Sequence, residues 1–183
     1  TCLNPFWFLR KMLPVILFAF STSSSNATIP LNLETLERKC GVDEKVASFT
    51  IPLGATINMS GTAIMQGVAV VFVAQAFGID LSTSALMTVV ITAVTAAIGT
   101  AGVSGVGTIM LAMVFESVGL PAAGIAMIMG VDRILDMGRT AVNVTGDAVV
   151  TMCMASLTKT LDRNVFQSRN EDLIEEPAKA PSE

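Results

Sequence analysis

The chain of 183 residues contains no histidine and only three cysteines. Cys2, Cys40 and Cys153 are scattered and odd in number, so neither a disulfide framework nor a zinc site is indicated. Histidine is also the commonest general base, and no serine with a plausible base and no pair of acids in a sugar cleft can be identified. We therefore expect neither an enzyme nor an enzymatic cofactor.

Charge is scarce as well. Charged residues make up 14% of the chain and hydrophobic residues 52%, and the mean hydropathy is +0.67. These values are far from those of a soluble domain and predict a membrane protein. The net charge of -4 comes mostly from two polar segments, residues 34–44 and 162–183. It therefore does not indicate a basic surface, and we do not expect nucleic acid as a partner.

The two ends of the chain suggest a piece of a longer protein. The first residue is Thr1 rather than methionine, and the pattern of a secretory leader is missing. We expect a fragment in which residues 1–4 end a preceding segment. Residues 161–183, whose end is rich in Glu, Lys, Pro and Ser, are expected to form a disordered cytoplasmic tail.

Four apolar regions follow one another, and each is interrupted. They cover residues 5–33, 46–77, 81–115 and 121–157. The first three are broken at STSSSNATIP, TINMSGT and GTAGVSGVG, and the fourth carries a series of charges. An unpaired backbone amide costs several kcal/mol in hydrocarbon, so such breaks are tolerated where they line protein or a water-filled cavity. Interrupted hydrophobic segments in two halves are typical of a transporter binding site.

The placement of lysine and arginine predicts how the first region enters the membrane. Arg10 and Lys11 lie near its start, whereas Arg38, Lys39 and Lys45 follow it. A single crossing would leave one of these clusters on the non-cytoplasmic side, against the positive-inside rule. A re-entrant hairpin, which enters and leaves from the cytoplasm, removes the conflict.

The remaining regions then alternate in direction. Residues 46–132 contain no lysine or arginine, so the connections near residues 78–82 and 117–121 suit the outer face. The predicted fold is an all-α, multi-pass protein of the cell membrane, with two re-entrant hairpins and two transmembrane helices, one of them broken, in an inverted repeat. The expected units are hairpin one at 5–40, the broken helix at 41–80, hairpin two at 81–118 and the last helix at 119–160.

The charged series gives the fourth region one polar face. At about 100° per residue, the polar side chains fall within an arc of roughly 80°. They are Asp132, Asp136, Arg139, Asn143 and Asp147, with Arg133 and Thr140 to the two sides. A charge at the bilayer centre costs about 3 kcal/mol on insertion scales, so we expect a cavity with a bound ligand beside this face. The alternative is a self-satisfied face in which Asp136 pairs with Arg139 and nothing binds.

The chemistry of this face fits a zwitterion with a further acid group. A carboxylate such as Asp136 can hold an ammonium group, and the Arg139 guanidinium can hold a carboxylate through two parallel hydrogen bonds. Asp147 is suited to a hard cation, and a helix unwound around Asn58 would add carbonyl oxygens. The glycine-rich break can fold against the ligand, although close helix packing also uses glycine. The serines of STSSSN are equally typical of helix caps and turns.

These strings together resemble the dicarboxylate/amino acid:cation symporter family. FSTSSSNATIP, PLGATINMSGTA, IGTAGVSGVG and LDMGRTAVNVTGD occur in the family's order. The family includes archaeal and bacterial aspartate and glutamate symporters and the mammalian excitatory amino acid transporters. The resemblance covers about residues 5–157 and implies hairpin one, broken helix seven, hairpin two and helix eight of a transport domain. It also implies a homotrimer whose trimerising helices lie outside this chain.

The resemblance assigns roles to residues. Asp136 would hold the substrate amino group and Arg139 its side-chain carboxylate, while Asn143 and Thr140 would lie at the main carboxylate. The other substrate contacts would be Ser25, Thr62, Val103 and Gly107. One sodium site would use the Asp147 carboxylate with main-chain oxygens of Gly54, Asn58 and Asn143. A second would use main-chain oxygens near Thr56, Ala97, Ile98 and Thr100.

Two positions depart from the family's pattern. Ser60 stands where relatives have an aspartate of a third sodium site, so that site is in doubt and a proton can take part in coupling. Some archaeal relatives carry an arginine at the position of Ser23, and the role of Arg133 is left open. The expected substrate is L-glutamate or L-aspartate, coupled to sodium, protons or both by alternating access. The alternatives are a C4-dicarboxylate or neutral amino acid symporter, an ion channel, or a structural membrane subunit.

Overall fold

The computed structural model describes residues 3–168, and every regular element in that part of the chain is an α-helix. The helices, in chain order, are α1 (Pro5–Thr22), α2 (Ser25–Arg38), α3 (Glu44–Ile57), α4 (Ser60–Ala76), α5 (Thr83–Ile98), α6 (Val106–Ser117), α7 (Gly124–Met129), α8 (Asp132–Leu157) and α9 (Arg163–Gln167).

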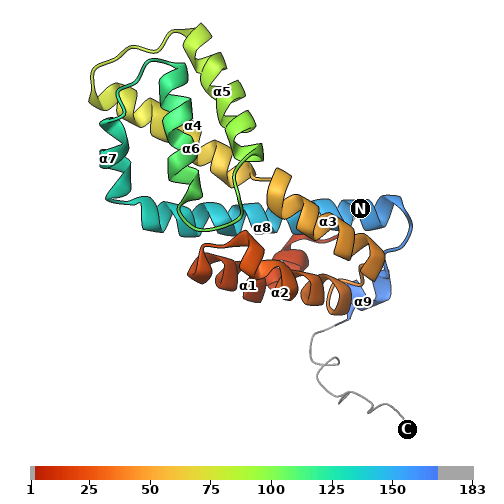
Figure 1. Ribbon diagram of the computed structural model, residues 1–183. Helices are drawn as coiled ribbons and strands as arrows, with labels where there is room; N and C mark the ends of the chain where they lie inside the picture. Colours follow the sequence, from red (N-terminus) through yellow and green to blue (C-terminus); the bar gives the residue numbers. More distant parts are fainter. Residues whose placement is uncertain (1–2, 169–183) are drawn as a thin grey trace.

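Helix α8 joins two groups of helices, each with its own apolar core (Figure 1). The first core is made by α1, α2, α3, α8 and α9, and Val15, Leu36 and Val144 are fully enclosed in it. The second core lies among α4, α5, α6 and α7 and contains Val70 and Leu111. Because α8 contacts α1, α3 and α4 along its length, its side chains face both groups.

Two helical hairpins arise where the sequence predicts breaks. Helices α1 and α2 pack together and are separated by Ser23, whose backbone is left-handed at φ 53°, and by Ser24. The Ser24 hydroxyl accepts a hydrogen bond from the Ala27 amide and so caps α2. Helices α5 and α6 form the second hairpin, and its tip is residues 99–105. Gly105, the residue before α6, has a φ of 84°, a conformation that glycine adopts without strain.

The second apolar region is broken at Asn58 and Met59, between α3 and α4. The Asn58 amide still donates to the Gly54 carbonyl at 2.8 Å, which closes the last turn of α3. The break thus lies where TINMSGT predicts it. Taken together, residues Glu44–Ala76 are long and apolar enough to cross a membrane, with a mean hydropathy of 1.6, and so are Asp132–Leu157, at 1.2.

The fourth region differs from the expected single helix at 119–160. It begins with the short helix α7, turns at Gly130 and Val131, and continues as α8. Helix α8 itself runs unbroken through the charged series, from Asp132 to Leu157.

The start of the predicted disordered tail is folded. Helix α9 lies inside residues 161–183, and the Phe166 side chain is 4% exposed. The Lys11 ammonium group, on a side chain that is 1% exposed, donates to the carbonyls of Lys39 and Val165 and lies 5.3 Å from the centre of the Phe166 ring. Composition did not predict helix α9 because its packing depends on a contact from Lys11, which is distant in sequence. Residues 169–183 of that prediction, and Thr1 and Cys2, lie outside the described residues.

Candidate functional site

The polar face of α8 is buried where the two groups of helices meet. The exposed fraction is 2% for Asp136, 7% for Arg139, 3% for Asn143 and 2% for Asp147. Asp132, at the first turn, is half-buried, and its carboxylate accepts a hydrogen bond from the Thr108 hydroxyl at 2.5 Å. The predicted face therefore exists, and residues of both hairpins and of the break between α3 and α4 cover it.

Asp136 and Arg139 form a buried ion pair. The Arg139 guanidinium donates to Asp136 Oδ1 from Nε at 2.7 Å and lies 2.6 Å from the same oxygen through Nη2. The second oxygen, Oδ2, accepts from the Ser104 hydroxyl at 2.7 Å and from the Gly105 amide at 3.1 Å. The carboxylate therefore has four donors, two of which come from the tip of the second hairpin.

Asn143 links α8 to the start of α4. Its amide oxygen accepts from the Gly61 backbone amide at 2.7 Å, and its amide nitrogen donates to the Thr62 hydroxyl at 3.1 Å. The same hydroxyl accepts a long hydrogen bond of 3.5 Å from Arg139 Nη1. Thr140 bonds the Asp136 carbonyl of its own helix. Asn143, Thr62 and Arg139 thus lie in one hydrogen-bonded group.

The tips of the two hairpins meet above this group. The Gly102 carbonyl accepts from the Asn26 amide and from the Ser24 hydroxyl, both at 3.0 Å. Gly102 lines a small cavity together with Ser25, which is buried, and Val103, which is 43% exposed. The predicted substrate contacts of the two hairpins therefore come together although they are nearly 80 residues apart in sequence.

The space between these residues is small. A cavity of about 10 Å³, room for no more than about one water molecule, is lined by six of the eight predicted substrate contacts: Ser25, Thr62, Val103, Arg139, Thr140 and Asn143. We expected a cavity for an amino acid. The structure closes it because Asp136 and Arg139 bind each other and residues 104–105 fold onto Asp136.

Gly107 lies against the same guanidinium. A Cβ atom at this position would overlap Nη1 of Arg139, so only glycine leaves room for the arginine as it is placed. Gln66, buried in the second turn of α4, donates a hydrogen bond of 3.4 Å to the Gly107 carbonyl, and its Oε1 atom has no hydrogen-bond partner among the described residues.

Asp147 lies against the break between α3 and α4, as the sequence predicts. Its Oδ1 atom accepts from the Asn58 side-chain amide at 2.9 Å. A Cβ atom added to Gly54 would lie 2.6 Å from the same oxygen, so the carboxylate packs directly on the α3 backbone. A carboxylate is an oxygen ligand that suits a hard cation, and Asn58 meets it here through its amide nitrogen, so a bound cation would take the place of that hydrogen bond.

The residues of the second predicted sodium site are only partly brought together. Ala97 and Ile98 line a cavity of about 350 Å³ together with Asn58, Met59 and Ser60. Thr100 is buried at the end of this segment, and its hydroxyl donates to the Ala96 carbonyl. Thr56 is exposed, its hydroxyl bonds Leu53, and it does not line that cavity.

Three residues near the site were not singled out from the sequence. Ser104 binds Asp136, Met59 Sδ accepts from the Asn143 amide nitrogen at 3.2 Å, and Gln66 reaches Gly107. Gly105, which also binds Asp136, belongs to the glycine-rich break that was expected to fold against the ligand. Only Ser104 had a visible signal, because it is the one hydroxyl residue after Thr100 in the glycine-rich break.

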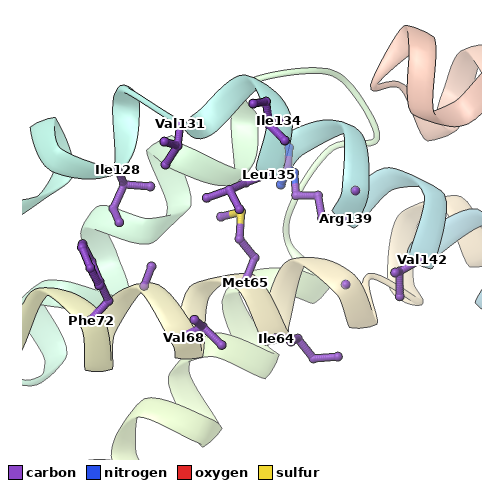
Figure 2. Close-up of a pocket in the computed structure, with 13 residues that line it drawn as sticks. Ile64, Met65, Val68, Phe72, Ile128, Val131, Ile134, Leu135, Arg139 and Val142 are labelled. Carbon is purple, nitrogen blue, oxygen red and sulfur yellow. The ribbon is translucent and has the colours of Figure 1, made fainter.

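A larger apolar groove lies outside the hairpin tips. It has a volume of about 480 Å³ and runs between α4 and the segment from α7 to α8 (Figure 2). Met65, Leu135 and Phe72 line it with other aliphatic side chains, and Arg139 is its one charged lining residue. Such walls cannot supply partners for two carboxylates and an amine, so we place the candidate site at the hairpin tips instead.

The chain is similar in sequence to a described family and to several named proteins. The family profile described as the Sodium:dicarboxylate symporter family matches residues 1–157. The mouse protein named Excitatory amino acid transporter 3 is 46% identical over 156 residues, which are 85% of this chain and 30% of that protein. The rat Excitatory amino acid transporter 1 is 39% identical over 170 residues, 93% of this chain and 31% of its own length.

A nematode relative extends this likeness. The Caenorhabditis elegans protein named Excitatory amino acid transporter is 43% identical over 146 residues, 80% of this chain and 29% of its own. The chain thus spans about 30% of the length of the relatives it matches. The matched family profile covers both hairpins, the broken helix and the whole polar face of α8, and the chain belongs to the sodium:dicarboxylate symporter family.

Proposed function

We propose that this chain is the substrate-binding part of a membrane symporter that moves L-glutamate or L-aspartate together with sodium, with protons, or with both. The observation that carries the proposal is the buried Asp136–Arg139 pair, enclosed by the tips of two hairpins. Its relatives are named excitatory amino acid transporters, which supports an acidic amino acid as the substrate.

In this proposal the substrate takes the place of the ion pair. Its ammonium group would bind Asp136, its side-chain carboxylate would bind Arg139, and its main carboxylate would lie near Asn143 and Thr140. The ammonium group and the side-chain carboxylate of the ligand match the two partners of the pair when Asp136 and Arg139 separate. The main carboxylate is a further buried negative charge, which a co-transported cation would balance. Ser25, Thr62, Val103 and Gly107 would form the remaining walls, since they lie around the same small cavity or against Arg139.

The cations would bind at the break between α3 and α4. Asp147, with oxygens of Gly54, Asn58 and Asn143, would hold one sodium ion, and main-chain oxygens near Thr56, Ala97, Ile98 and Thr100 would hold a second. Ser60 offers a hydroxyl where relatives carry an aspartate. We therefore leave open both the number of coupled ions and whether a proton is one of them. Cation binding would order the break, and Asn143 reaches from it to the substrate pocket.

The arrangement in the membrane follows from the charges. We infer that α1–α2 and α5–α6 are re-entrant hairpins that enter from opposite sides, with α3–α4 and α8 as the spans between them. The second hairpin would be the outer gate, and the C-terminal end would face the cytoplasm of a cell-membrane protein. The full protein would be a homotrimer that carries loaded substrate by alternating access.

The proposal is tested by uptake into vesicles that contain the purified full-length protein. Radiolabelled aspartate and glutamate are offered under a sodium gradient alone and under a proton gradient alone. We expect accumulation against the substrate's own gradient under at least one of the two. Substrate that only equilibrates under both gradients contradicts coupled transport and favours a channel, and the absence of both uptake and binding favours a structural subunit.

The Asp136–Arg139 pair also distinguishes acidic amino acids from the two alternative substrate classes. A C4-dicarboxylate has no amine and would leave the Asp136 carboxylate unmatched in a buried site, and a neutral amino acid would leave Arg139 unmatched. Unlabelled succinate and serine are therefore included as competitors. Stronger competition by either one than by aspartate would replace the proposed substrate class.

A further inference from the structure

Arg133 lies at the start of α8 and reaches both hairpin tips. Its Nη1 atom donates to the Ser104 hydroxyl at 3.2 Å, and its Nη2 atom donates to the Ser21 carbonyl at 3.4 Å. Ser21 belongs to the last turn of α1 and Ser104 to the tip between α5 and α6. One planar guanidinium therefore connects three segments that are far apart in sequence, and its side chain is exposed at the mouth of the site.

The contact with Ser104 continues to the buried carboxylate. A hydroxyl group has one proton to donate, and Ser104 donates it to Asp136 Oδ2 at 2.7 Å. The Ser104 oxygen can therefore accept a hydrogen bond from Arg133 while the hydroxyl still donates to Asp136. A donated hydrogen bond from a cation polarises the hydroxyl and strengthens its own donation, because hydrogen bonds in series reinforce one another.

The second hairpin tip has few other ties to α8. Besides the Ser104 contact, the Gly105 amide bonds Asp136 and the Thr108 hydroxyl bonds Asp132. Gly105 has a φ of 84°, and its amide reaches Asp136 from this left-handed turn. Arg133 bonds both this tip and the first hairpin from α8, in addition to the direct bonds between the two tips at the Gly102 carbonyl.

We propose that Arg133 is a positioning residue: it ties the tips of the two hairpins to α8 and, through the Ser104 hydroxyl, orients the Asp136 carboxylate. The inference deepens the proposed function and rests on it for the meaning of Asp136 as a substrate contact. Arg133 touches no substrate in this arrangement. It sets how firmly the second hairpin closes and which way the carboxylate points when an amine arrives.

The test measures closure of the tip without requiring transport. Thr100 is 2% exposed, and a cysteine placed there by Thr100→Cys, with Cys2, Cys40 and Cys153 replaced by alanine, reports opening of the tip. The protein is reconstituted into lipid vesicles and modified by a small water-soluble methanethiosulfonate. We expect Arg133→Met to speed modification about fivefold. This is the size of effect expected when a charge-assisted hydrogen bond is lost at an exposed site.

Matched variants separate this role from a general effect of charge. Arg10→Met removes another exposed arginine, which stacks on Trp7 far from the tips, and should leave the rate unchanged. Arg133→Lys keeps the charge but loses the fork, so we expect a rate between parent and Arg133→Met. In the background of Ser104→Ala, Arg133→Met should add clearly less than it does alone, because the two residues act through one bond.

Several results would overturn the proposal. They are an unchanged modification rate in Arg133→Met, an equal acceleration by Arg10→Met, and full additivity with Ser104→Ala. Failure of the symporter function is distinguishable, because uptake is measured separately. If modification follows the expected order while no substrate accumulates, the positioning role of Arg133 stands and the proposed function falls.

Discussion

The guanidinium of Arg139 lies 2.6 Å from the carboxylate of Asp136, and both groups are buried within one turn of α8. Removing water from two charges is costly, and the pair recovers that cost only through close contact and further hydrogen bonds. Ser104 and Gly105 supply those bonds to the carboxylate. A ligand that separates the pair must therefore offer one group to each partner.

Replacing Arg139 should change which substrate is accepted. Arg139→Cys leaves no cation for a side-chain carboxylate, so we expect uptake of aspartate and glutamate to fall at least about a hundredfold, the effect of losing a bidentate buried partner of about 3 kcal/mol. Uptake of small neutral amino acids should remain or appear. Arg10→Cys is the control for a lost exposed arginine. Undiminished glutamate uptake by Arg139→Cys would contradict the assignment.

Replacing Asp147 should weaken the response to sodium. Asp147→Asn keeps the shape of the side chain beside Asn58 and Gly54 but removes its charge. We expect the sodium concentration that gives half-maximal thermal stabilisation of the purified protein to rise about tenfold or more, which corresponds to about 1.4 kcal/mol. The exposed Asp80→Asn serves as the control. Equal sodium responses in the two variants would remove Asp147 from the cation site.

Two glycines beside Arg139 allow a comparison of steric effects. Gly107→Ala places a methyl group on the guanidinium, so we expect aspartate binding, measured by calorimetry, to weaken at least about tenfold as the arginine is displaced. At Gly138, no described atom beyond its own helix and chain neighbours lies within 4 Å of an added Cβ. Gly138→Ala should therefore bind normally and gain up to about 1 kcal/mol in helix stability. Equal binding by both variants would contradict the close approach at Gly107.

The buried Lys11 should hold helix α9 in place. Lys11→Met removes hydrogen bonds to the carbonyls of Lys39 and Val165, a loss of about 2 kcal/mol for bonds that involve a charged donor. We expect limited proteolysis between residues 158 and 168 to become several times faster. Lys45→Met, at an exposed lysine, provides the comparison. If both variants are cleaved at the rate of the parent, Lys11 does not anchor this helix.

The helical breaks and the polar face could be predicted from the sequence because both are local properties. Long apolar runs indicate where α3, α4 and most of α8 lie, and the spacing of Asp136, Arg139 and Asn143 gives a shared face on any helix. The positions of the breaks follow from glycine, serine and asparagine within apolar runs. Those features need no knowledge of distant contacts.

The closure of the pocket could not be predicted in the same way. It depends on hydrogen bonds between residues 31 or 32 positions apart, from Ser104 and Gly105 to Asp136, and on the left-handed turn that aims them. The fold of α9 was missed for a similar reason, because a single lysine from α1 binds its backbone. Composition describes segments one at a time, whereas these contacts join segments.

The hydrogen bonds accepted by the Gly102 carbonyl have a consequence for which substitutions the two hairpin tips tolerate. One donor to this oxygen is the main-chain N–H of residue 26, so any side chain at that position except proline preserves the bond. Residue 102, which supplies the accepting carbonyl, has little room for a side chain. A Cβ atom there would lie 2.6 Å from the Asn26 side chain and 3.1 Å from the Ala55 carbonyl. In a saturation library we expect residue 26 to accept many substitutions and residue 102 to accept almost none, an asymmetry between two partners of one hydrogen bond.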